Sequence, residues 1–93
     1  MLVGTLKITL DIPWANSLKD KRAVVKSLAA KLRDKFGVSV AEVDSQDVHR
    51  TAVLGIACVG SSTGAIDSVL DHILNWLEAS SQAPVISVRR EII

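Results

Sequence analysis

The chain has 93 residues, of which 48% are hydrophobic and 23% are charged, and its net charge is +1. This length predicts one domain spanning residues 1–93, and the apolar fraction excludes an intrinsically disordered chain. A lone cysteine excludes an internal disulfide framework, and no apolar run reaches the roughly 18 residues of a membrane span, so we expect a cytoplasmic protein without membrane contact.

The first predicted element is a strand over residues 1–12. Apolar Leu6, Ile8 and Leu10 alternate with polar residues, which is the period-two pattern of a half-buried strand. Pro13 ends the strand because proline has no N–H to donate to the sheet.

A helix is predicted over residues 17–36. Ser17 and Asp20 approximate a capping box at its start, and Gly37 is suited to end it. The apolar positions recur at helical spacing and are Leu18, Val25, Leu28, Ala29, Leu32 and Phe36. Lys21 falls near this apolar face, and we expect its stem to carry the ammonium group out to solvent.

Three further strands and a second helix complete the pattern. Strands are predicted over residues 38–44, 50–60 and 85–93, a helix over 65–80, and loops over 45–49, 60–64 and 80–84. The strand over 50–60 is apolar on both faces, so the pattern leaves open which face meets solvent. In the second helix, Trp76 lies at the edge of the apolar stripe and is expected to pack against the rim of the core.

The order βαββαβ predicts an α+β, ferredoxin-like fold. Right-handed crossovers give an antiparallel sheet of order 4-1-3-2, with both helices on one face. The opposite face is expected to carry polar residues and the small residues of the third strand, which suits water or another sheet. Its polar residues are Thr5, Lys7, Thr9, Ser87 and Arg89.

The charge is unevenly distributed along the chain. Residues 16–36 hold seven basic and two acidic residues, a net charge of +5, so the remainder carries −4. Lys19, Arg22, Lys26 and Arg33 form a stripe beside the apolar face of the first helix. Lys31 and Lys35 lie on its other flank.

This basic helix is the best candidate for binding RNA. Phosphates could meet its cations and the free N–H groups at its start, and Trp14 in the preceding loop could stack on a base. The predicted RNA-binding residues are Trp14, Ser17, Lys19, Lys21, Arg22, Lys26 and Arg33. The alternative is a solvated helix face, with Trp14 folded over the core edge and the acidic second helix neutralising the charge. Neither central strand carries an aromatic residue, so bases are not expected to stack on the sheet.

No residue set suggests catalysis or a bound cofactor. Cys58 lies among apolar residues and is expected to be a structural thiol. Four residues around the predicted turn could offer oxygen and nitrogen ligands, but their spacing matches no metal motif and turns are naturally rich in aspartate. They are Glu42, Asp44, Asp47 and His49. We therefore expect neither an enzyme nor a metal protein.

Four segments in order carry a resemblance to a known family: Ile12-Pro13, Ser17–Arg22, Val38–Asp47 and Val88–Ile92. Together they resemble the YlxP-like family of small bacterial proteins of unknown function, over essentially the whole chain. The resemblance implies a ferredoxin-like fold and no established activity. It also implies an RNA or ribosome partner by association, because such proteins are commonly encoded beside translation and ribosome-maturation genes. No family role is carried over to Trp14.

Two functional hypotheses follow. The first is a non-catalytic module that associates with RNA or a ribosomal subunit through the basic helix. The second is a homo-oligomeric interaction protein without direct nucleic-acid binding, which pairs with a second copy through the open sheet face or an edge strand. A dimer could also present two basic helices, so the two hypotheses are compatible.

Overall fold

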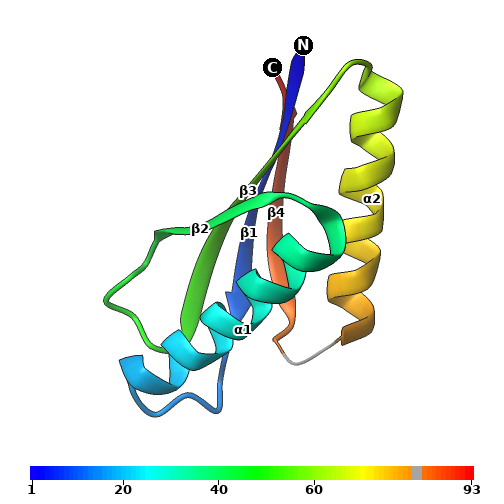
Figure 1. Cartoon of the computed structure of the whole chain (residues 1–93). Helices are drawn as coiled ribbons and strands as arrows, with labels where there is room; N and C mark the ends of the chain where they lie inside the picture. The colour runs from blue at the N-terminus through cyan, green and yellow to red at the C-terminus, as the bar shows by residue number, and fades with distance from the viewer. Residues whose placement is uncertain (81–82) are drawn as a thin grey trace.

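The computed structural model describes residues 1–80 and 83–93. The elements are β1 (Leu2–Asp11), α1 (Leu18–Phe36), β2 (Ser39–Asp44), β3 (Thr51–Gly60), α2 (Thr63–Ser80) and β4 (Val85–Ile92) (Figure 1). The strands form one antiparallel sheet in the order β2-β3-β1-β4. The predicted ferredoxin-like βαββαβ fold and its strand order are confirmed. Of the predicted loop over 80–84, residues 81 and 82 lie outside the described residues.

The register of the central strands decides which side of β3 meets solvent. Leu6 pairs with Ile56 and Ile8 pairs with Leu54, and all four are buried in the core that the helices cover. Because side chains alternate along a strand, Gly55 and its odd-numbered neighbours occupy the open face. The open face therefore carries Thr5, Lys7, Thr9, Gly55, Ala57, Ser87 and Arg89.

The two helices close the core from the same side of the sheet. α2 approaches β1 closely at Gly4, where an added Cβ would collide with Ile66. Trp76 packs edge-to-face on Phe36 of α1, with ring centroids 6.1 Å apart. The predicted packing of Trp76 at the core rim is thus confirmed, and this aromatic pair ties the two helices together.

The ends of α1 follow the predicted capping chemistry. Gly37 adopts a left-handed conformation (φ 63°), and its N–H donates to Arg33 O over 2.9 Å. Glycine suits this position because it lacks the Cβ that makes positive φ costly. In the part of the chain that the structure describes, neither helix is both long and apolar enough to cross a membrane.

Candidate nucleic-acid interface

A tight turn presents Trp14 to solvent just before α1. Ala15 N donates to Ile12 O over 3.1 Å, and both residues are fully buried. Pro13, with its fixed φ, occupies the second position of this turn, where proline is favoured. Trp14 follows at the third position and is 48% exposed. Its ring therefore keeps a free surface, although it stands beside the core.

Side chains already occupy the start of α1. Ser17 Oγ accepts from Asp20 N over 3.1 Å, and Asp20 Oδ2 accepts from Asn16 N over 3.0 Å. This is a variant of the predicted capping box, in which the carboxylate reaches one residue further back. Asp20 also supplies the negative charge that the helix dipole favours there. A phosphate at the helix terminus would meet this carboxylate, so Ser17 is best described as a helix cap.

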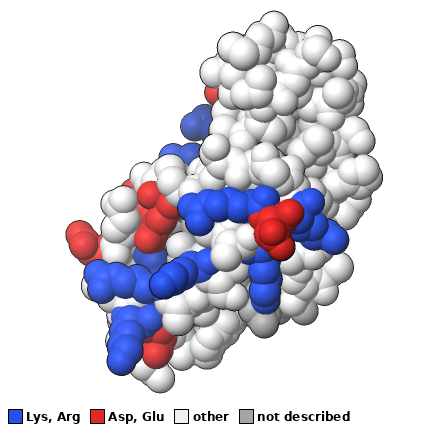
Figure 2. Space-filling model, in the orientation of Figure 1, with Lys and Arg blue, Asp and Glu red and all other residues white. Residues whose placement is uncertain are grey.

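The basic stripe lies along the side of α1 that borders the β2 edge. Arg33 is exposed and donates through Nη2 to Val40 O over 2.6 Å, which places this flank beside β2. Lys19, Arg22 and Lys26 are exposed and form no ion pair within residues 1–80 and 83–93. Figure 2 shows Lys and Arg side chains gathered over the region of α1, with few acidic side chains among them.

Lys21 does not belong to this exposed surface, and the prediction that its ammonium reaches solvent is wrong. The residue is 1% exposed, and its Nζ lies 2.6 Å from Glu42 Oε2. It also donates to Ser45 O over 2.6 Å and to Val48 O over 2.7 Å. The ammonium turns inward because Glu42 of β2 offers a carboxylate oxygen and the loop between β2 and β3 offers two carbonyl oxygens. Lys21 therefore has no free capacity for a phosphate.

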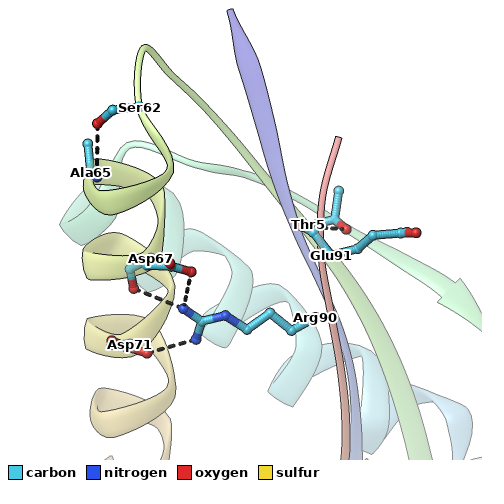
Figure 3. Close-up of polar contacts among 7 residues, drawn as sticks. All are labelled: Thr5, Ser62, Ala65, Asp67, Asp71, Arg90 and Glu91. Carbon is cyan, nitrogen blue, oxygen red and sulfur yellow. Dashed lines mark hydrogen bonds and ion pairs between the residues drawn. The ribbon is translucent and has the colours of Figure 1, made fainter.

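Two of the three acidic side chains of α2, Asp67 and Asp71, are paired with β4. Arg90 of β4 reaches Asp67 Oδ1 and Asp71 Oδ1, each over 2.7 Å, and also donates to Asp67 O (Figure 3). Hydrogen bonds to Asp67 and then Asp71 raise the pKa of Arg90 above its ordinary value. These two aspartates thus bind β4, and the basic stripe of α1 is left without them.

The remaining candidates do not assemble into a site. Glu42 contacts Lys21, and no group of three His, Cys, Asp or Glu residues stands close enough to hold a metal ion among the described residues. Cys58 is half-buried on the helix side of β3, opposite Gly4.

Sequence reasoning missed the burial of Lys21 and the pairing of Arg90. A signal existed for the first. Val38 and Val40 alternate into the core, and the same period places Glu42 on the core face, where a carboxylate needs a cation. For Arg90, the period of two along β4 places its side chain on the same face as Val88, which is the face that the helices cover. Its partners on α2 could not be predicted, because they depend on how that helix crosses the sheet.

Comparison of the sequence with known proteins finds a family and a relative. Residues 3–90 match the family described as "Protein of unknown function (DUF503)". The "Uncharacterized protein YlxP" of Bacillus subtilis (strain 168) is 37% identical over 78 residues, which cover 84% of this chain and 85% of the relative.

Two solved structures show the same fold at low sequence identity. A de novo designed protein with a ferredoxin fold, LFR1 1, aligns with a TM-score of 0.56 and 14% identity, covering 99% of this chain and 85% of the design. The VAO-type flavoprotein MtVAO615 of Myceliophthora thermophila C1 aligns with a TM-score of 0.57 and 20% identity. This chain, aligned over 99% of its length, spans 16% of that flavoprotein, so the likeness concerns the fold alone.

The family match over residues 3–90 and the identity to YlxP agree with the sequence motifs around the first helix and the last strand. The chain therefore belongs to the DUF503 family of proteins of unknown function.

Proposed function

We propose that this protein is a non-catalytic RNA- or ribosome-associated module that binds the phosphate backbone through α1. The observation that supports it best is the exposed stripe of Lys19, Arg22 and Lys26, which lacks carboxylate partners among the described residues. Cations near the start of a helix oppose its dipole, at a cost of a few tenths to about 1 kcal/mol each. Bound phosphates would offset that cost.

The proposed binding surface is smaller than the set predicted from sequence. It keeps all four residues of the stripe, although the Arg33 guanidinium already uses one of its donors on Val40 O. Trp14 adds an exposed ring at one end of the helix, suited to stacking on an unpaired base. Lys21 leaves the set because it is buried, and Ser17 contributes as a helix cap.

The test is a salt titration with two matched double variants. Lys19→Glu/Lys26→Glu reverses two charges of the stripe, and Lys31→Glu/Lys35→Glu makes the same change in net charge on the opposite flank of α1. Binding of single-stranded poly(U) is measured by fluorescence anisotropy, and binding of purified bacterial ribosomal subunits by co-sedimentation. Circular dichroism establishes that each variant is folded.

We expect affinity to fall steeply with salt, with each phosphate contact adding about 0.7 to the logarithmic slope for single strands. The stripe variant should lose two contacts and lower this slope by about 1.4, whereas the opposite-flank variant should stay close to the wild type. Equal affinities for all three proteins would contradict the proposal. So would salt-insensitive binding, because phosphate contacts release counterions.

A further inference from the structure

The two edges of the sheet differ in how they are protected. At the β2 edge, the Arg33 guanidinium covers Val40 O, and a register shift interrupts the strand between Glu42 and Asp44. Side-chain cover and a bulge are two ways in which natural sheets avoid edge pairing. β4 forms the other edge, next to β1, and its last residues pair with β1 without interruption from Ser87 to Ile92 (Figure 1).

The ladder between β1 and β4 shows which backbone groups of β4 point outward. Val3 and Ile93 exchange two hydrogen bonds of 2.8 Å. Bonded and non-bonded pairs alternate in an antiparallel ladder, so Glu91 and Arg89 also bond to β1. The N–H and C=O groups of the residues between them point away from the sheet. These residues are Val88, Arg90 and Ile92.

We infer that β4 pairs antiparallel with β4 of a second copy of this chain, around a two-fold axis at Arg90. Only residues with outward backbone groups can bond across such an interface, which restricts the registers. With the axis at Arg90, Val88 lies opposite Ile92 of the second copy and Arg89 lies opposite Glu91. Symmetry repeats both pairs, so one strand supplies both halves of a charge-complementary contact.

Charge argues against the adjacent registers. Shifting the axis towards the start of β4 to position 89 places Arg89 opposite itself, and shifting it the other way to position 91 places Glu91 opposite itself. Like charges directly opposite on a sheet are destabilising, whereas opposite charges there contribute about 0.2–1 kcal/mol per pair. The self-complementary register is thus the favoured one among these three.

The side chains on the helix face suit the same register. Val88 is 43% exposed although it faces the helix layer, and pairing with Ile92 of the second copy would cover it. The two Arg90 side chains would meet near the axis, but each is already neutralised by Asp67 and Asp71 (Figure 3). α1 lies towards the β2 edge, so the dimer leaves the basic stripe free and does not depend on the proposed RNA binding.

Two single charge reversals and their combination test the inference. Arg89→Glu and Glu91→Arg each convert both attractive pairs into repulsive ones, and each should weaken dimerisation about 10- to 100-fold. The double variant Arg89→Glu/Glu91→Arg restores opposite charges and should dimerise like the wild type. An equimolar mixture of the two single variants should form a heterodimer, because each reversed side chain then meets its complement.

The measurement is sedimentation equilibrium on nucleic-acid-free protein. A wild type that remains monomeric up to about 1 mM overturns the inference, since it leaves less than about 4 kcal/mol for association. A dimer that both single reversals leave intact places the interface elsewhere and also overturns it. If one single variant fails to fold, the other single variant decides: loss of its dimer with recovery in the double variant supports the pairing, and an intact dimer refutes it.

Discussion

Among the described residues, two ionic clusters each join a helix to the sheet, and they differ in burial. At one, Lys21 of α1 is enclosed with Glu42 and the carbonyls of Ser45 and Val48, and its side chain is 1% exposed. At the other, Arg90 of β4 lies at the surface between Asp67 and Asp71, which are more than half exposed. Both clusters join a helix to the sheet, but water screens only the second.

The difference teaches that the energy of an ion pair depends on what its loss leaves behind. Without Lys21, the Glu42 carboxylate, whose Oε2 atom is buried, and two loop carbonyls in partly buried hydrogen bonds would lose their donor. Glu42 Oε2 has no hydrogen-bond donor in good geometry besides this charged contact. Without Arg90, both aspartates would return to solvent at little cost.

The largest effect is expected for Lys21→Met, which keeps the length of the stem and removes the charge. Breaking a buried pair by deleting one partner costs about 3–5 kcal/mol, because the other charge stays buried and uncompensated. We therefore expect a loss of that size in the free energy of unfolding, measured by urea denaturation. A loss below about 1 kcal/mol would mean that water reaches Glu42 readily and that the two clusters are alike.

An intermediate effect is expected when both charges of the buried pair are replaced. Lys21→Met/Glu42→Leu leaves no orphaned charge, and apolar replacements of buried pairs are often neutral or stabilising. Two loop carbonyls still lose a donor, so we expect a net loss of about 1–2 kcal/mol, smaller than for Lys21→Met alone. The double variant should therefore unfold at higher urea than the single one. If the loss of stability in the double variant equals the sum of the losses in Lys21→Met and in Glu42→Leu, the two residues are not coupled.

The smallest effect is expected for Arg90→Met. Exposed ion pairs contribute about 0.2–1 kcal/mol, and this side chain joins two of them, so a loss of about 1 kcal/mol is expected at low salt. In 1 M NaCl the difference from the wild type should shrink, whereas that for Lys21→Met should persist. Both should be measured at low protein concentration, where self-association contributes nothing. A salt-independent loss would show that the Arg90 cluster behaves as buried.

The pKa of Arg90 sets the expected pH dependence of its cluster. Because the folded-state pKa of Arg90 is raised, the stabilising contribution of this group is fully present below the ordinary pKa that arginine has in the unfolded chain. It is lost only as the pH rises through the still higher folded-state value. The difference in stability between the wild type and Arg90→Met should therefore not diminish between pH 7 and pH 10 through any deprotonation of Arg90.

Much of the fold could be predicted from local pattern. Alternation in the first strand, the cap residues Ser17 and Gly37, and the apolar stripes of both helices are properties of neighbouring residues, and they placed the element boundaries within a few positions. The candidate site was less predictable. The stripe of α1 follows from helical spacing, but spacing does not say which cations meet a carboxylate from a distant part of the chain.

The sequence by itself determined the order of elements and the exposed flank of α1, because periodicity and capping act over a few residues. It also determined the strand order of the sheet, because the crossovers between parallel strands are right-handed. Only the tertiary structure decided three other features: the inward turn of Lys21, the pairing of Arg90 with α2, and the solvent-facing side of β3. Each depends on contacts between residues far apart in the chain. The packing of the elements decides which side chains are buried and which charges pair. The same residue can therefore face solvent in one arrangement and be buried in another.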